Sequence, residues 1–110
     1  MKLDPHTRVP LWYIDAALAE LNEMRGWFRL PPLNAMPHGV PNDTQCCPIG
    51  VGLAPKNAYV GRSVVSFPNG EAAQMSINTK MFVRWFDEPN LMLHNAAKQS
   101  RKNGALVRIN

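Results

Sequence analysis

Apolar residues near the start of the chain recur with the period of a helix. Five of them lie along one stripe in residues 10–25: Ile14, Ala17, Leu18, Leu21 and Met24. Charged residues, including Arg25, fall outside this stripe, and Trp12 and Tyr13 flank it. The pattern predicts an amphipathic helix over 10–25, with Pro10 at its first position and Gly26 ending it.

Four prolines follow within residues 31–43. Because proline fixes φ and disfavours helix at the residue before it, this segment should be extended. Its apolar residues, Leu30, Leu33, Met36 and Val40, indicate an ordered wrap that turns these side chains inward.

The next segment predicts a short helix that ends at Leu53 and has Pro48 in its first turn. Three residues fit its start: Asp43, Thr44 and Cys47. Gly50 and Gly52 each destabilise such a helix by about 1 kcal/mol relative to alanine. The helix then depends on packing, so we expect another backbone or an aromatic ring close to both glycines.

The pattern then changes to apolar and β-branched runs on either side of the turn Pro68-Asn69-Gly70. This arrangement is typical of a β-hairpin, with strands near 58–67 and 71–77.

A second core helix is expected over 79–87, capped by Asn78 or Thr79 and ended by Pro89. Its apolar side chains are Phe82, Val83, Trp85 and Phe86. Residues 90–102 fit a last helix, and 105–110 fit either a short edge strand or a frayed end. The predicted class is α+β in a single domain, 1–110: an N-terminal amphipathic helix, a proline-rich wrap, a short helix, a β-hairpin, a second core helix and a basic C-terminal extension over 89–110.

Composition narrows the class of protein. The chain has 110 residues, of which 45% are hydrophobic and 18% are charged, and this excludes a disordered chain. It has no long apolar run, its first ten residues lack the apolar region and cleavage site expected of a secretory leader, and its two cysteines are adjacent, which excludes a disulfide framework. We therefore expect a cytoplasmic protein with reduced thiols and no membrane association.

Two stretches, MPHGVPNDTQCCPIGVGL at 36–53 and INTKMFVRWFDEPNL at 77–91, resemble small uncharacterised proteins of actinobacteria and their bacteriophages, mycobacteriophages included. The shared pattern is Gly-x-Pro-x-Asp, a Cys-Pro-Ile helix start, a β-hairpin and a helix that ends in Phe-Asp. The matching positions here are Gly39, Pro41, Asp43, Cys47, Pro48, Ile49, Leu53, Phe82, Phe86 and Asp87. The resemblance implies a fold and an actinobacterial or phage origin. A phage protein would then lie in the host cytoplasm. The resemblance does not point to any activity.

The adjacent Cys46 and Cys47 raise the question of metal or nucleophilic chemistry. A structural zinc site needs four ligands, and these thiols have only His6, His38 or His94 from distant segments to join them. A catalytic Cys47 needs a base, for which His38 is the near candidate. We expect one buried cysteine beside an exposed one, with no catalytic residue, metal, cofactor or small-molecule substrate.

The chain carries more large aromatic residues than a small core can cover completely. Rings that remain exposed would form a contact surface for another protein. We expect this surface to contain Trp12, Trp27, Phe28 and Trp85. The predicted function is non-enzymatic binding of a host protein or of a second copy of the chain.

The positive charge of the chain is concentrated at its end. Residues 1–88 hold eight basic and eight acidic residues, whereas 89–110 hold no acidic residue and four basic ones: Lys98, Arg101, Lys102 and Arg108. A basic tail attracts phosphate in a salt-dependent way, which gives the alternative function of a nucleic-acid-associated regulator. The predicted helix that precedes the hairpin carries no lysine or arginine, so sequence-specific contacts in a DNA groove are not expected.

Overall fold

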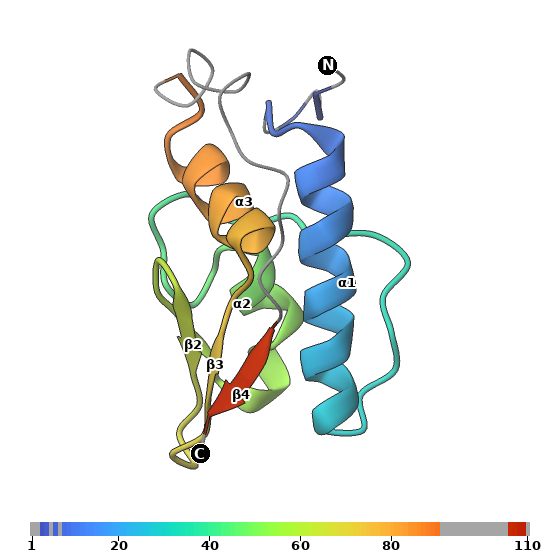
Figure 1. Cartoon of the computed structure of the whole chain (residues 1–110), viewed down its shortest axis with the longest axis vertical. Coiled ribbons are helices and arrows are strands. Elements are labelled where there is room, and N and C mark those ends of the chain that lie inside the picture. The colour runs from blue at the N-terminus through green and yellow to red at the C-terminus, as the bar shows by residue number, and fades with distance from the viewer. Residues whose placement is uncertain (1–2, 5, 7, 91–105, 110) are drawn as a thin grey trace.

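The computed structural model describes residues 3–4, 6, 8–90 and 106–109, and it confirms the α+β class (Figure 1). The helical elements are α1 (Leu11–Trp27), α2 (Pro48–Gly52), the 3-10 turn η1 (Ala54–Lys56) and α3 (Ile77–Asp87). The strands are β1 (Tyr59–Val60), β2 (Val64–Ser66), β3 (Ala72–Gln74) and β4 (Val107–Ile109). No helix within these described ranges is long and apolar enough to cross a membrane.

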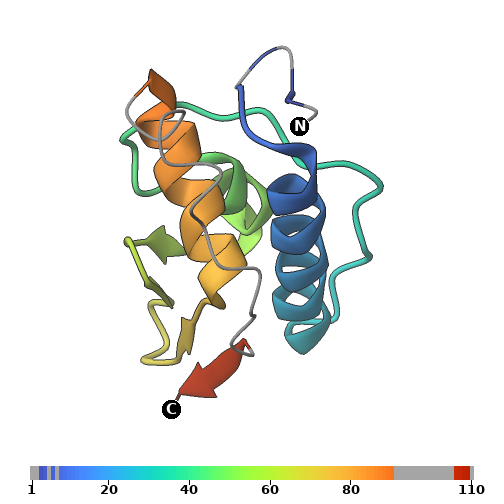
Figure 2. The ribbon, with the colours of Figure 1, turned by 45° about the horizontal axis from the view of Figure 1, so that its top comes forward.

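The four strands form one antiparallel sheet in the order β1-β2-β3-β4, and the helices gather on one side of it (Figures 1 and 2). In the two-fold alternation of a strand, Val60, Val65 and Ala73 point to the helices and are buried. α1 and α3 stand side by side and pack against each other. The core therefore lies between this helix pair, α2 and the inner face of the sheet.

The N-terminal helix follows the predicted stripe with a shifted centre. Tyr13, Ala17, Leu21 and Met24 are its buried apolar residues, so Tyr13 lies in the stripe and the prediction that it flanks the stripe is wrong. Pro10 precedes the first helical residue, and its carbonyl accepts the amide of Tyr13 at 3.0 Å.

Gly26 does not end α1, which continues through Trp27. The left-handed residue is Arg29, with φ of 60°. The Leu30 amide donates to the Arg25 carbonyl at 2.9 Å, and the Arg29 amide donates to the Gly26 carbonyl at 3.1 Å. This pair of bonds is a Schellman motif, which satisfies the last carbonyls of the helix and turns the chain into the wrap.

Arg25 is buried, although its position outside the apolar stripe predicted a solvent-facing charge. Its Nε donates to the Pro31 carbonyl at 2.8 Å, and its Nη1 donates to the Gly52 carbonyl at 2.6 Å. A guanidinium carries five N–H donors and is tolerated in a core when carbonyls satisfy them. Arg25 thus joins α1 to the start of the wrap and to the last turn of α2.

Replacement of Arg25 by methionine should lower the free energy of unfolding by about 2 kcal/mol, because the buried Gly52 carbonyl and the part-buried Pro31 carbonyl lose their donor. Methionine keeps most of the apolar stem, so the loss reports the hydrogen bonds. Arg25→Lys should recover part of it, since an ammonium reaches one carbonyl but lacks the planar fork. Urea unfolding measures all three proteins, and equal midpoints for Arg25→Met and the unchanged chain would contradict this role.

Asn22 of α1 holds the proline-rich wrap at a second point, beyond the Arg25 contact. Asn22 Nδ2 donates to the Leu33 carbonyl at 3.0 Å, and Asn22 Oδ1 accepts the Leu33 amide at 2.8 Å. Leu33 and Met36 pack against the core as predicted. Val40 is 54% exposed, so the prediction that it turns inward is wrong. Its amide donates to the Cys46 carbonyl at 2.7 Å, and this main-chain bond, rather than side-chain burial, holds the segment at Val40.

The short helix α2 begins at Pro48, with Cys47 as its N-cap; the sulfur of Cys47 accepts the Gly50 amide at 3.4 Å. Asp43 and Thr44 are therefore not its first residues. The carboxylate of Asp43 instead accepts the amides of Gln45 and Cys46 at 3.0 and 2.9 Å, within the turn before the helix. The Gln45 bond, followed by the Cys46 bond, lowers the pKa of Asp43 from its ordinary value.

Three glycines lie where a side chain has no room. A Cβ on Gly50 would come within 2.5 Å of the Gln45 carbonyl oxygen, which confirms the predicted close backbone. A Cβ on Gly52 would meet the Leu21 side chain at 2.6 Å, so its neighbour is aliphatic, not a backbone or an aromatic ring. Gly39 is the tightest, with the Pro48 nitrogen at 2.4 Å from the same added atom.

The predicted hairpin turn is confirmed, with Gly70 at φ of 90° and its amide bonded to the Phe67 carbonyl at 3.0 Å. The predicted strand over 58–67 is wrong in extent, because a turn closed by the Gly61 amide and the Val64 carbonyl splits it into β1 and β2. The second predicted strand, 71–77, is shorter and ends at Gln74.

α3 begins earlier than predicted. Its cap is Ser76, whose hydroxyl accepts the Thr79 amide at 3.3 Å, whereas Asn78 and Thr79 lie inside the helix and are buried. The predicted edge strand at the end of the chain is confirmed as β4. The predicted helix over 90–102 lies, except for residue 90, outside the described residues.

Candidate protein-binding end of the fold

Two neighbouring rings, Trp27 and Phe28, lie half-buried at the C-terminal end of α1. The Phe28 ring packs on Phe67, with centroids 4.8 Å apart and planes tilted by 57°. Phe67 is buried and precedes the turn between β2 and β3. The end of α1 therefore meets the β2–β3 turn through an aromatic pair whose outer ring is reachable from solvent.

A positively charged side chain lies close to each of the two rings. Lys56 Nζ lies 5.3 Å from the Phe28 ring centroid, and the Arg108 guanidinium carbon lies 4.9 Å from that of Trp27. Both distances are within the range of cation–π attraction. Lys56 comes from η1 and Arg108 from β4, so segments far apart in the sequence meet at this end of the fold.

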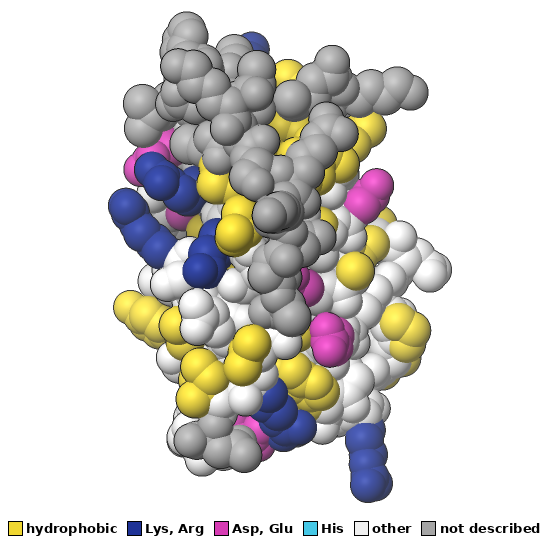
Figure 3. Space-filling model, viewed as in Figure 1, with side chains coloured by type: hydrophobic (Ala, Val, Ile, Leu, Met, Phe, Trp, Pro, Cys, Tyr) yellow, Lys and Arg dark blue, Asp and Glu magenta, His cyan; other side chains and the backbone are white. Residues whose placement is uncertain are grey.

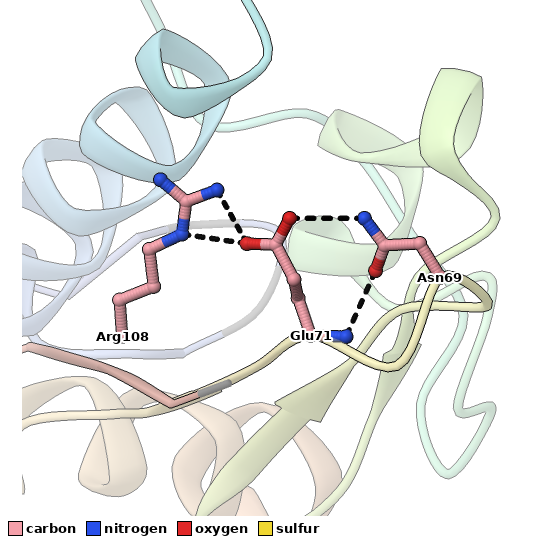
Figure 4. Close-up of polar contacts among 3 residues, drawn as sticks. All are labelled: Asn69, Glu71 and Arg108. Carbon is pink, nitrogen blue, oxygen red and sulfur yellow. Dashed lines mark hydrogen bonds and ion pairs between the residues drawn. The ribbon is translucent and has the colours of Figure 1, made fainter.

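Arg108 is held in place by a chain of polar contacts (Figure 4). Its Nε donates to Glu71 Oε2 at 2.6 Å, and its Nη2 forms an ion pair with the same oxygen. Asn69 Nδ2 donates to Glu71 Oε1 at 3.0 Å, and the Glu71 amide donates to Asn69 Oδ1 at 2.8 Å. This network fixes β4 to the β2–β3 turn and neutralises the charge of Arg108.

Beside Phe28 the surface opens into a cleft of about 290 Å³, which we call the Phe28 cleft. Its lining combines two rings, two prolines and three polar side chains: Phe28, Phe67, Pro55, Pro68, Lys56, Asn57 and Asn69. In the space-filling view, hydrophobic side chains surround basic and acidic ones at the lower end of the molecule (Figure 3). An apolar floor with a few polar groups at its rim is the usual composition of a binding cleft.

Trp12, also predicted for the contact surface, lies at the opposite end of α1. It precedes Trp27 by fifteen positions, which corresponds to roughly 22 Å along a helix. Its ring packs on Tyr13, with centroids 3.9 Å apart. The predicted tryptophans therefore do not form one surface.

Trp85 is fully buried in α3, so its prediction as part of an exposed surface is wrong. α3 is buried on most of its circumference, since it packs against α1 and carries Met81, Phe82, Val83 and Phe86 into the core. Sequence reasoning missed Lys56, Phe67 and Glu71. Phe67 had a usable signal, because an aromatic residue directly before a tight turn lies at the end of a hairpin, where a helix end can cover it.

The predicted nucleic-acid residues are only partly within the described structure. Arg108 donates to Glu71 and lies over the Trp27 ring, so its charge is not presented freely to a phosphate. Lys98, Arg101 and Lys102 lie outside the described residues.

The cysteines follow the prediction, with Cys46 exposed and Cys47 buried. Burial is the main cause that raises the pKa of the Cys47 thiol above its ordinary value of 9.0. His38, the candidate base, lies edge-on to His6 with centroids 5.5 Å apart. Across the described ranges, His, Cys, Asp and Glu side chains form no group of three that could hold a metal ion.

Iodoacetamide should label Cys46 as an ordinary exposed thiol and leave Cys47 protected at neutral pH, because the reactive thiolate of Cys47 is suppressed and covered. Since the folded pKa of Cys47 is raised, its contribution to stability is fully present below its ordinary value and is lost as pH rises through the folded value. Mass spectrometry of labelled peptides at neutral pH measures the first effect, and urea unfolding from neutral pH to above 9.0 measures the second. Labelling of Cys47 faster than a free thiol at neutral pH would contradict this assignment and favour an enzymatic function.

A second hollow, of about 180 Å³, lies between the end of α3 and the turn before α2. Asp87 Oδ1 accepts the Asn42 amide there at 2.8 Å, which ties the end of α3 to this turn. Glu88 pairs with Arg62 at 3.8 Å, and Arg62 is 80% exposed, so this pair contributes little to stability. The carboxylate of Asp87 thus has a structural partner at the rim of the hollow.

Comparison of the chain with protein-family models, curated proteins and solved structures found no match in any of the three.

Proposed function

We propose that the chain is a protein-binding domain without catalytic activity, and that the Phe28 cleft together with Trp27 is its docking surface. The observation that supports this best is the half-buried Phe28 ring, which packs on Phe67 on one side and opens into the cleft on the other. Aromatic residues are enriched in the cores of protein interfaces, where a few well-packed side chains supply most of the binding energy. The ring is positioned by a helix end and a tight turn, so little ordering is needed when a partner binds.

The charge around the cleft favours an acidic partner. Lys56 lies over the Phe28 ring, and Arg29 is the residue that follows Phe28 in the chain. In the described part of the chain, the ion pairs are Arg62–Glu88 and Arg108–Glu71, so neither Lys56 nor Arg29 is neutralised by a carboxylate. We propose a partner segment with an apolar or aromatic side chain flanked by aspartate or glutamate. The sequence resemblance directs the search to proteins of an actinobacterial host.

Binding of nucleic acid through the basic tail remains the alternative from the sequence. The contacts of Arg108 do not favour it, because one of the four basic residues already has an acidic partner. We therefore develop the protein-binding proposal.

The immobilised full chain should retain a partner from host lysate, and Phe28→Ala and Lys56→Glu should each lower the affinity by about tenfold or more. Two control variants change the same properties elsewhere: Leu11→Ala removes an exposed apolar side chain at the other end of α1, and Arg84→Glu reverses an exposed charge on α3. Circular dichroism checks that all four remain folded. Equal binding by the folded cleft variants and by the controls would refute the proposal, as would loss of binding in all four.

A further inference from the structure

The two edges of the sheet differ in how they end. Beyond β1, the Val60 amide donates to the Thr44 carbonyl at 2.7 Å, so the chain itself covers that edge. β4 is the other edge, and no strand formed by the described residues lies beyond it. Among the described residues, β4 is therefore the one edge that no segment covers, and an open edge is a template for another strand.

The charged side chain of β4, Arg108, does not block pairing at this edge. A lysine or arginine on an edge strand commonly prevents pairing. Arg108, the middle residue of β4, reaches instead to Glu71, the residue directly before β3 (Figure 4). Its guanidinium also lies over the Trp27 ring on the inner face of the sheet. Its ion pair with Glu71 removes most of the repulsion that a second copy of this arginine would meet.

The other two residues of β4 are apolar and exposed. Val107 is 51% and Ile109 is 40% exposed, and both point to the outer face of the sheet, opposite to Arg108. The strand therefore reads apolar, arginine, apolar, and this order is the same in both directions. An antiparallel copy centred on Arg108 would place each Val107 beside the Ile109 of the other copy.

We propose that β4 pairs with β4 of a second copy of this chain in an antiparallel, two-fold arrangement, which joins the two sheets into one of eight strands. The inference is independent of the docking cleft. Because the β1 edge is already covered, the pairing closes at a dimer and does not grow into a filament. The strands are three residues long, so the dimer should be weak and dependent on concentration.

Sedimentation velocity of the full chain, across about two orders of magnitude in concentration, should show a monomer that converts to a dimer. Val107→Lys combined with Ile109→Lys should raise the dissociation constant by about tenfold or more, because four lysines would then face one another across the pair. The matched control combines Val40→Lys with Tyr59→Lys: both side chains are exposed apolar ones away from β4, with exposed fractions of 54% and 55%.

The register has its own test. In a Cys46→Ala background, Arg108→Cys should form a disulfide between copies under mild oxidation, since paired Cα atoms lie about 4.5–5.5 Å apart at the two-fold position. Val107→Cys should form it far less, because it faces Ile109 of the other copy. A chain that stays monomeric, a species larger than a dimer, equal weakening by the control, or stronger cross-linking at 107 than at 108 would each overturn the proposal.

Discussion

Replacement of Trp85 by alanine should lower the free energy of unfolding by about 3–5 kcal/mol, the usual cost of truncating a large buried aromatic residue. Trp85 is fully buried on α3, the helix that packs against α1, so the cavity would open in the centre of the core. Total stabilities of domains are about 5–15 kcal/mol, and much of the stability would therefore be lost. Urea unfolding followed by circular dichroism measures the change.

Trp85→Phe is the control for this prediction. It keeps most of the buried ring and removes an indole N–H that finds no hydrogen-bond acceptor among the described residues. The loss should therefore be well below that of Trp85→Ala. Similar losses for both variants would mean that the indole shape, and not the buried volume, matters most. Loss of partner binding in Trp85→Ala would report unfolding, so Phe28 variants are the proper probes of the cleft.

Replacement of Gly39 by alanine should destabilise the fold by about 3 kcal/mol, because the new methyl group would overlap main-chain atoms. Those atoms lie 2.4–2.6 Å from the added Cβ and belong to Cys46, Cys47 and Pro48, where the chain enters α2. A backbone cannot move aside as a flexible side chain can. The wrap and the start of α2 would have to separate, and thermal unfolding should show the loss.

Gly26→Ala is the matched control and should have the opposite sign. Gly26 lies within α1, and nothing approaches within 4 Å of an added Cβ. Alanine there should stabilise the chain by about 1 kcal/mol through helix propensity. If both alanine variants destabilise equally, the tight approach at Gly39 is not the cause.

The elements that depend on neighbouring residues were predictable. The stripe of α1 and the turn at Gly70 follow from spacing and from local backbone requirements; the turn was predicted in place, and the stripe was predicted with its centre shifted. The predicted boundaries were less accurate where several neighbouring residues could cap a helix about equally well, as at the start of α3, where the cap is Ser76. Asn78 and Thr79 are also good caps, and only the packing of the helix shows which one starts it.

The long-range contacts were not predictable from the sequence. Arg108 and Glu71 are 37 positions apart, and nothing in either neighbourhood indicates that they meet. The burial of Arg25 was missed for the same reason, because its acceptors are main-chain carbonyls that any residue type supplies. Trp27 and Trp85 have similar local surroundings in the sequence, yet the first lies at a helix end and the second in the core.

The contacts of Arg25 also bear on how this chain can change over evolution. When two side chains form an ion pair, both can be exchanged together and the interaction is preserved. The acceptors of Arg25 are the main-chain carbonyls of Pro31 and Gly52, and every residue type supplies such a carbonyl. No second substitution at either acceptor can then compensate for the loss of this arginine, so in a random library position 25 should tolerate few replacements and should not covary with residues 31 and 52.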